Sequence, residues 1–290
     1  MAPVSPLAQA RSTLADVPAT RALVGLSGKD ALCTLDLCIE HFGVGNVQAF
    51  TMVLVRDLEC EWAHIRRVQG RYKGLEVHQV FHWKLAEHLR RGIYRDYSAE
   101  AAKAPVLKQK DIENDLRQKT GIAWVALGMR CSDSLVRNAY LKGPSCVNFV
   151  APREKRFFPI ASWKKRDVYG YLHAKKLPVP PILGGGTVNG GVSLYGETLA
   201  WIEERHPDDF RKILEVFPYA RAGVLKYRRD EALRVATNAE NEKARAAAAA
   251  AAAGKEAVRA VALARSRGSE GEEEPRAEGA RPEVERRRRA

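Results

Sequence analysis

The chain has 290 residues, of which 46% are hydrophobic and 29% charged. That is enough for one large or two small globular domains with a hydrophobic core, and too much for a peptide or mini-protein. No run of 18 or more apolar residues occurs, and residues 1–19 lack a basic stretch followed by an apolar one, so we expect no membrane span and a cytoplasmic location. Five cysteines, an odd number at irregular spacing, argue against a disulfide framework.

The formal net charge of +13 belongs mainly to the first 230 residues. Residues 231–290 contain 13 lysines and arginines and 11 acidic residues, which leaves +11 on residues 1–230 and +2 on the tail. We expect residues 231–253, which end in an alanine run, to be helical, with a break at Gly254. Residues 266–290 are too polar to bury a core, and we expect them to be disordered or frayed, with the terminal arginine block solvated.

In residues 20–217, short apolar runs alternate with amphipathic segments of helical length, a pattern typical of a parallel sheet covered by helices. Strands are predicted at residues 22–26, 47–55, 75–81, 122–127 and 157–160. Helices are predicted at residues 30–41, 59–71, 83–91, 106–119, 164–175, 198–205 and 208–217, the last with Asp208 as its cap. The prolines of residues 177–181 predict an extended segment, and the glycines of residues 184–191 predict a flexible loop after it.

The segment Leu26-Ser27-Gly28-Lys29-Asp30-Ala31 carries the strongest chemical signal. It follows the first predicted strand, at the carboxyl edge of the sheet, where open α/β folds bind ligands. Exposed backbone N–H groups, a helix N-terminus and the charge of Lys29 suit a phosphate or pyrophosphate, to which Ser27 could donate a hydrogen bond. The Walker pattern is absent, because no glycine lies five residues before Gly28 and Asp30 replaces Ser or Thr. The alternative is a tight turn with Asp30 as the helix N-cap.

Residues 24–31 resemble the pyrophosphate-binding loop S-G-G-K-D-S/T of the adenine nucleotide α-hydrolase (PP-loop ATP pyrophosphatase) superfamily. Two later blocks are similar to its phosphoadenosine phosphosulfate reductase branch. Gly128-Met129-Arg130, followed by Asp133-Ser134 and Arg137, matches a strand that ends in G-x-R with an acidic or Ser residue and a second Arg. Residues 159–171 match P-I-x-x-W-x-x-x-D-V-x-x-Y.

The resemblance implies a Rossmann-like five-stranded parallel sheet with helices on both faces. It implies an enzyme that binds ATP or an adenylyl sulfate across the carboxyl ends of the strands and acts at or beside the α-phosphate. By position, the nucleotide-binding residues are Ser27, Gly28, Lys29, Asp30, Gly128 and Arg130. Lys29, Arg130 and Arg137 are the implied catalytic cations, since a guanidinium fork matches a tetrahedral anion. Without the resemblance, Arg130 and Arg137 would be interpreted as an i, i+7 pair on a solvated helix.

Composition, patterning and the resemblance together suggest four parts for the chain. Residues 1–19 form an N-terminal arm, and residues 20–182 form the PP-loop nucleotide-binding domain. Residues 183–230 form a glycine-rich loop with a helical extension, and residues 231–290 form the alanine-rich helix and charged tail. Oligomeric state is left open.

The sequence departs from the family pattern in its loop and its thiols. One glycine of the loop is missing, and Ala31 stands where a Ser or Thr hydroxyl commonly touches the phosphates. Neither the E-C-G-L-H motif of the reductases nor paired cysteines for a cluster follow Cys146, which argues against thioredoxin-dependent reduction and an iron–sulfur cluster. Cys33 and Cys38 are expected to be small buried hydrophobes. Cys131 and Cys146 are the best candidates if thiol chemistry exists.

Other polar residues give weaker signals. Asp57, Glu59 and Glu61 follow the second strand and are candidates to hold Mg²⁺ against nucleotide phosphates, or are a charged loop and helix start. Flanking glutamates should raise the pKa of the Cys60 thiol. We expect structural roles for His78 and His82.

Three functions stay open at this point: an enzyme acting on ATP or an adenylyl sulfate, a nucleic-acid modifier of the sulfur-transfer type, and a non-catalytic nucleotide-binding protein. The charge of +11 on residues 1–230, with clusters at residues 108–110 and 164–166, keeps a nucleic-acid partner open. We favour the enzyme acting on ATP or an adenylyl sulfate, because Lys29, Arg130 and Arg137 are better explained as residues that hold nucleotide phosphates than as nucleic-acid contacts.

Overall fold

The computed structural model describes residues 5–179 and 194–268. The chain divides into two compact units, Met1–Arg229 and Asp230–Ala290. The boundary between them lies beside the expected start of the alanine-rich helix. The predicted loop glycines of residues 184–191 and the terminal arginine block lie outside the described residues.

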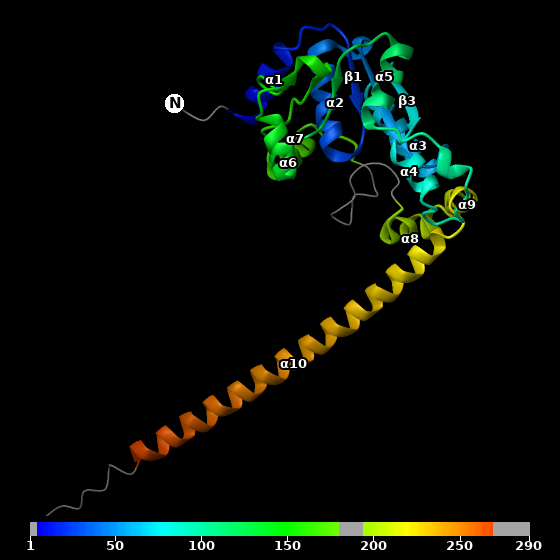
Figure 1. Cartoon of the computed structure of the whole chain (residues 1–290). Helices are drawn as coiled ribbons and strands as arrows, with labels where there is room; N and C mark the ends of the chain where they lie inside the picture. The colour runs from blue at the N-terminus through cyan, green and yellow to red at the C-terminus, as the bar shows by residue number, and fades with distance from the viewer. Residues whose placement is uncertain (1–4, 180–193, 269–290) are drawn as a thin grey trace, which may run out of the picture. The chain divides into compact units, whose positions relative to one another are not determined.

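The first unit contains a sheet with the strand order β3-β2-β1-β4-β6-β5. Figure 1 labels β1 and β3 of this sheet. The strands are β1 Ala22–Gly25, β2 Val47–Val53, β3 Glu76–Phe81, β4 Val125–Ala126, β5 Val150–Ala151 and β6 Arg156–Phe157. Neighbouring strands are parallel except β5 and β6, which are antiparallel. Because β1 is paired on both sides and buried along its whole length, its carboxyl end lies between those of β2 and β4.

The predicted α/β fold with a mainly parallel sheet is confirmed, and the sheet has six strands instead of five. The additional strand, β5, has two residues, which is too short for an alternating pattern to be visible in the sequence. Strands β4 and β6 are shorter than the apolar runs that predicted them. Ile122 is buried by packing with Leu116, so the apolar run before β4 reflects helix packing as well as strand pairing.

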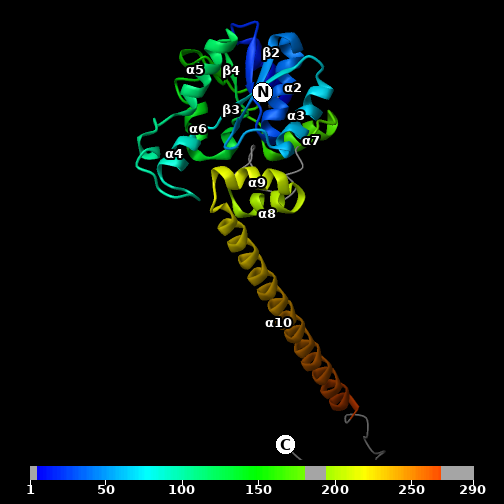
Figure 2. The ribbon, with the colours of Figure 1, turned by 90° about the vertical axis from the view of Figure 1, so that its right-hand side faces the viewer.

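Helices cover both faces of the sheet. They are α2 Gly28–Phe42, α3 Glu59–Arg71, α4 Lys84–Arg90, α5 Gln109–Thr120, α6 Leu135–Leu141 and α7 Lys165–Ala174. Val24 packs in a cluster with residues of α2, α3 and α7, whereas the adjacent Leu23 packs with Leu116 of α5. Figure 2 shows α5 on one side of the strands and α2, α3 and α7 on the other. This alternation is the expected result of strand side chains that point to opposite faces.

The N-terminal arm contains a helix that was not predicted, α1 Pro6–Ala15. Its Ala10 and Leu14 are buried in the main core. The indole Nε1 of Trp163 donates to the Pro6 carbonyl at 2.9 Å. The Asn148 amide donates to Ser12 Oγ at 3.0 Å. These contacts attach α1 to the connections that follow β4 and β6.

A second core holds the helical extension, α8 Gly196–Arg205, α9 Pro207–Val216 and the first residues of α10 Ala220–Gly268, against the loop after β2. Asp209, which is 1% exposed, accepts hydrogen bonds from the backbone N–H groups of Glu59 at 2.9 Å and Cys60 at 2.8 Å. Its carboxylate therefore closes the N-terminus of α3. The predicted cap of α9 at Asp208 is wrong: the N-cap is His206, because Pro207 suits the first helical position.

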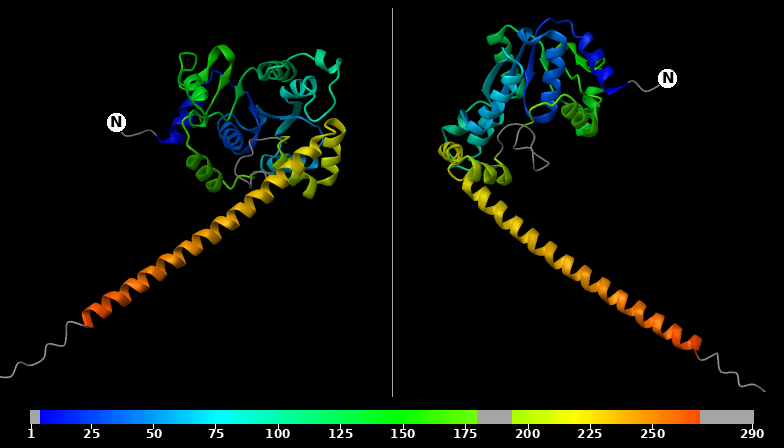
Figure 3. Two further views of the ribbon diagram at one scale, coloured as in Figure 1. Left: turned by 60° about the horizontal axis from the view of Figure 1, so that its bottom comes forward. Right: turned by 180° about the vertical axis from the view of Figure 1, so that it is seen from behind.

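The second unit begins within α10, which Figure 3 draws as one uninterrupted helix. The expected break at Gly254 is wrong, since the helix runs through it to Gly268, consistent with the high helix propensity of the alanines before it. The first three residues of the segment expected to be disordered, 266–268, are also helical, and its remaining residues lie outside the described part. Among the described helices, none has the length and apolar character needed to cross a membrane.

Candidate functional site

The turn between β1 and α2 forms the first part of the site. Gly28 has φ 78, a conformation that residues with a Cβ rarely adopt, and the helix begins at this residue. The predicted helix start at Asp30, and with it the alternative of Asp30 as N-cap, is wrong: Ser27 is the N-cap. Ser27 is exposed, and its side chain makes no capping hydrogen bond. Its hydroxyl therefore lies at the surface beside the first turn of α2.

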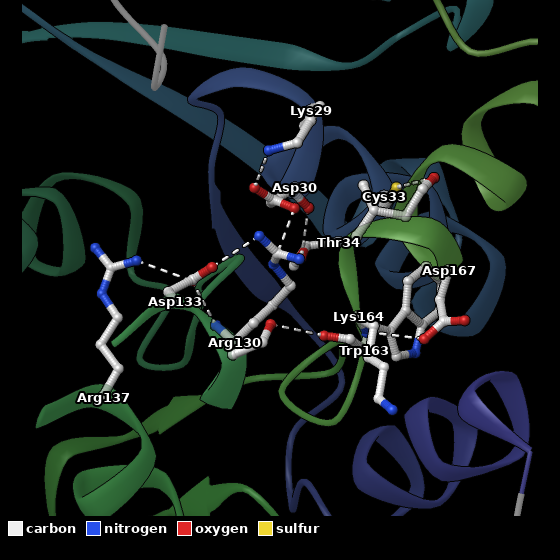
Figure 4. Close-up of polar contacts among 12 residues, drawn as sticks. Lys29, Asp30, Cys33, Thr34, Arg130, Asp133, Arg137, Trp163, Lys164 and Asp167 are labelled. Atoms are coloured by element: carbon white, nitrogen blue, oxygen red, sulfur yellow. Dashed lines mark hydrogen bonds and ion pairs between the residues drawn. The ribbon is translucent and has the colours of Figure 1, made fainter. Parts of the chain in front are cut away.

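A chain of ion pairs links this turn to the segment after β4 (Figure 4). Lys29 Nζ lies 2.8 Å from Asp30 Oδ2, and Arg130 Nε lies 3.1 Å from Asp30 Oδ1. Arg130 Nη2 lies 2.7 Å from Asp133 Oδ1, and Arg137 Nη1 lies 2.9 Å from Asp133 Oδ2. We call these five residues the Arg130 network. It brings together all three cations that the sequence singled out.

Arg130 lies at the centre of the network. The residue is only 7% exposed. Its Nη1 is buried and has no hydrogen-bond partner within the described residues. A guanidinium carries five N–H donors, and a buried donor without an acceptor is costly. The arrangement therefore leaves a donor group that an added anion can satisfy.

Gly128 lets the two parts of the site approach each other. A Cβ at this position would lie 2.8 Å from the backbone nitrogen of Ala31 and 2.8 Å from the carbonyl carbon of Asp30. Any side chain would therefore push the segment after β4 away from α2. The structure gives this predicted nucleotide-binding residue a packing role, which holds Arg130 within reach of Asp30.

Arg137 occupies a more open position, with half of its side chain exposed. It lies in α6, whose N-cap Ser134 accepts a hydrogen bond from the Arg137 backbone N–H at 3.2 Å. Arg130 precedes the 3-10 turn Cys131–Asp133 and is not helical. The interpretation of the two arginines as a pair on one solvated helix is therefore wrong, and their connection runs through Asp133.

The second family block, residues 159–171, contacts the segment that follows Arg130. Ser132 Oγ donates to the Trp163 carbonyl at 3.2 Å. Asp167 accepts from the Lys164 backbone N–H at 2.8 Å and so caps α7. Figure 4 shows Trp163, Lys164 and Asp167 beside Arg130. These residues position the connection between β6 and α7.

The cysteines are placed for packing. Cys33 and Cys38 are fully buried and Cys60 is 2% exposed, which confirms the interpretation of Cys33 and Cys38 as small hydrophobes. Burial raises the pKa of the Cys33 thiol to about 12. Burial raises the pKa of Cys60 as well, followed by the charge of Asp209, and the expected effect of Glu61 is smaller. Burial also raises the pKa values of Cys131 and Cys146, which are partly exposed.

Two of the three carboxylates proposed for Mg²⁺ are engaged within the protein. Glu59 forms an ion pair with Arg66, and Glu61 accepts from Gln79 Nε2 at 3.4 Å. Within the described residues, no group of three or more His, Cys, Asp or Glu side chains is arranged to hold a metal ion. The structure thus gives no support to a magnesium site of these residues.

The histidine in β3, His78, and the one directly after it, His82, have protein partners. His78 Nε2 lies 3.0 Å from Gln48 Oε1. His82 Nδ1 accepts from the Lys84 backbone N–H at 3.0 Å, and burial lowers its pKa to about 4. Both contacts agree with the structural roles expected from the sequence.

Comparison with known proteins places the chain in a family. The model of the phosphoadenosine phosphosulfate reductase domain matches residues 21–224. The chain therefore belongs to the phosphoadenosine phosphosulfate reductase domain family. The match covers the sheet, the Arg130 network and the helices α8 and α9. No curated protein matches the chain.

Solved structures similar to this family member include two enzymes. The phosphoadenylyl-sulfate reductase from Candida auris, in a phosphate complex, has 14% identity and a TM-score of 0.41, and the match covers 64% of this chain and 88% of the reductase. The U34-tRNA thiolase NcsA from Methanococcus maripaludis, with its [4Fe-4S] cluster, has 18% identity and a TM-score of 0.41, with 75% and 78% covered. At these values the likeness carries no argument about function.

Proposed function

We propose that this protein binds ATP or an adenylyl sulfate at the Arg130 network and acts at or beside the α-phosphate. The observation that carries the proposal is the convergence of Lys29, Arg130 and Arg137 on one chain of ion pairs. That chain lies at the carboxyl ends of β1 and β4, the edge at which open α/β sheets bind ligands. Membership of the reductase domain family supports an adenine nucleotide as the ligand.

The network has the charge and geometry that a phosphate group needs. Three cations surround two carboxylates, so the network carries one net positive charge. Asp30 and Asp133 repel a phosphate, and we assign to them the role of holding the cations in place. An arriving anion would accept from Arg130 Nη1, from Lys29 and from the N–H groups at the start of α2.

Catalysis at such a site is mainly a matter of position and charge. Donors that are fixed before the reaction stabilise the negative charge that develops when a bond at the α-phosphate, or at the group attached to it, breaks. Arg130 is fixed by two carboxylates and burial. Arg137, with its half-exposed side chain, is placed to contact the end of the ligand that reaches solvent.

Isothermal titration tests this proposal with three ligands: ATP, adenylyl sulfate and phosphoadenosine phosphosulfate. We expect heat of binding with at least one of them and its loss in Lys29→Ala. The matched control is Lys175→Ala, since Lys175 pairs with Glu40 away from the network. No heat with any ligand, or equal losses in both variants, would refute the site.

A non-catalytic nucleotide-binding protein is the second candidate. The observation in its favour is that burial raises the pKa of every cysteine in the chain, so none is held as a thiolate near neutral pH. Ala31 also replaces a hydroxyl of the family loop. Incubation with α-labelled ATP and sulfate or sulfite as acceptor distinguishes the candidates, because an enzyme releases labelled AMP or a labelled adduct and a binding protein returns intact ATP.

A further inference from the structure

Two aromatic rings lie at the end of β3, each faced by a cation. Phe81 is the last residue of β3 and is in register with Val53, the last residue of β2. The Arg56 guanidinium lies over the Phe81 ring, 4.6 Å from its centroid. Lys84 Nζ lies over the Trp83 ring at 5.3 Å. We call Arg56, Phe81, Trp83 and Lys84 the Phe81–Trp83 surface.

The surface is held in place by contacts to the sheet. Arg56 Nη2 donates to the Gln79 carbonyl at 3.3 Å. The His82 ring stacks on Trp83, with centroids 5.4 Å apart and an interplanar angle of 30°. The His82 backbone N–H donates to the Val53 carbonyl at 2.8 Å, which extends the pairing of β3 with β2 beyond Phe81. The two rings are therefore fixed before any ligand arrives.

The two rings differ in exposure. Phe81, at the end of the edge strand β3, is 45% exposed, and Trp83 is partly exposed. An exposed ring covered on one side by a guanidinium has a π-face and a cation available together. Arg56 and Lys84 are exposed as well.

The segment that continues from the surface is basic. Residues 84–110 contain seven lysines and arginines against three acidic residues. The same segment presents Tyr97 with 69% of its area exposed. Positive charge next to exposed aromatic rings is the combination found where proteins bind single strands of nucleic acid, with phosphates on the cations and bases on the rings.

We propose that the Phe81–Trp83 surface binds single-stranded nucleic acid by stacking bases on Phe81 and Trp83. Arg56, Lys84 and the following basic segment contact its phosphates. An acidic protein segment is the competing ligand, but it would need only the cations and would leave the fixed aromatic rings unexplained.

The position of the surface connects it to the Arg130 network. Strand β2 separates β3 from β1, so at a spacing of about 4.8 Å the strand ends are roughly 10 Å apart across the sheet. A strand of nucleic acid on the surface would thus reach the edge at which the proposed nucleotide binds. We infer that this nucleic acid is the second substrate of the enzyme, an inference that rests on the proposed function. The binding of nucleic acid to the Phe81–Trp83 surface does not depend on that function.

Fluorescence anisotropy with a 5′-fluorescein-labelled oligothymidylate of about 20 nucleotides tests the proposal. We expect binding at low salt and a loss of about tenfold in affinity for Phe81→Ala and for Trp83→Ala, within the range for single stacked bases. Tyr169→Ala is the matched control. Tyr169 is 46% exposed, and its ring centroid lies 5.9 Å from Lys165 Nζ. Both residues belong to α7, which is not part of the Phe81–Trp83 surface. Its affinity should equal that of the unaltered protein.

Two further probes separate stacking from charge. An abasic oligomer with the same number of phosphates should bind about as weakly as the Phe81→Ala variant binds the normal oligomer. Arg56→Ala and Lys84→Ala, at exposed positions that leave the fold intact, should each lower the slope of log affinity against log salt by roughly one half to one. Circular dichroism verifies the fold of every variant.

The proposal fails if the oligomer does not bind at low salt, if the abasic oligomer binds equally well, or if Tyr169→Ala loses as much as Phe81→Ala. If an acidic peptide displaces the oligomer and binds Phe81→Ala and Trp83→Ala as well as the unaltered protein, the surface binds acidic protein segments instead of nucleic acid. Calorimetry with ATP on the same variants keeps the two proposals apart. In Phe81→Ala and Trp83→Ala, an unchanged heat of ATP binding together with a loss of oligomer binding supports the proposed nucleic-acid surface. Lys29→Ala should lose ATP binding and keep oligomer binding.

Discussion

The ion network around Glu113 and the Arg130 network both combine arginines with carboxylates, but they differ in how many of their buried donors have an acceptor. Glu113 is fully buried and accepts from Arg156 Nε at 2.8 Å and from Gln109 Nε2 at 2.9 Å. Arg117 lies 3.6 Å from the same carboxylate and donates to the Ala123 carbonyl at 2.8 Å. In the Arg130 network, the buried Nη1 of the central arginine has no such partner among the described residues.

The difference separates an architectural network from the proposed binding site. The Glu113 network joins α5 to β6, and its buried groups all have acceptors or donors within the protein, so it needs nothing more. A buried donor that lacks an acceptor costs free energy unless a ligand or water fills the gap. We therefore expect an added anion to stabilise the Arg130 network and not the Glu113 network.

The largest expected effect comes from breaking the architectural network. Glu113→Ala removes the charge that Arg117 and Arg156 face, and leaving buried charges unpaired costs about 3–5 kcal/mol of unfolding free energy. Urea unfolding measures it. The control is Asp115→Ala, whose pair with Lys119 at 2.7 Å is exposed and should contribute less than about 0.5 kcal/mol. Equal losses would show that the Glu113 network is not structural.

A smaller effect, on binding instead of stability, is expected at the site. Arg130→Lys keeps the charge but removes the guanidinium fork that contacts Asp30 and Asp133 and offers Nη1. We expect the binding free energy for the nucleotide to fall by about 1.5–3 kcal/mol, the usual contribution of a hydrogen bond to a charged group. Titration calorimetry checks this. Unchanged affinity would mean that Nη1 does not contact the ligand.

Elements with a clear apolar pattern could be predicted from the sequence, and several elements without one could not. Strands β1, β2 and β3 and helices α3 and α7 have clear apolar periodicity, and the structure places them within about two residues of their predicted bounds. Helix α6 lacks such periodicity, because its Leu135 and Val136 are 87% and 80% exposed. Helix α1 is anchored by Trp163 and Asn148, far away in the sequence.

The residues of the site could be singled out from motifs, but their connections could not. Asp133 was visible only as part of a pattern, and its position between Arg130 and Arg137 depends on the 3-10 turn before α6. The hydrogen bond from the Glu59 backbone N–H to Asp209, which caps the N-terminus of α3, joins residues 150 positions apart. No local spacing predicts such contacts, because they depend on how separate elements pack.

His64 tests whether an unused buried donor is by itself enough to mark a site. Both of its ring nitrogens are buried and lack hydrogen-bond partners in the described part of the chain. Burial lowers its pKa to about 4. The unfolded chain therefore binds a proton at a higher pH than the folded one, and stability should decrease as pH falls from about 6.5 to about 4.

The pH dependence gives His64 a measurable signature. The decrease should amount to roughly 2 kcal/mol by pH 4.5, and urea unfolding of His64→Phe should show a shallower slope over this range. Nucleotide affinity at pH 7 should be unchanged by the substitution. A loss of affinity would show that unused donors outside the Arg130 network also contribute to binding.

The smallest expected effect is at Arg137, the exposed end of the network. Its pair with Asp133 is half exposed and should contribute less than about 1 kcal/mol to stability, so Arg137→Ala should unfold almost as the unaltered protein does. If Arg137 contacts the phosphate or sulfate end of the ligand, affinity should fall several-fold, and the loss should shrink as salt is raised, because exposed charges are screened. Titrations at two salt concentrations measure this. A loss independent of salt would place Arg137 in a buried contact, and no loss would confine the site to Lys29 and Arg130.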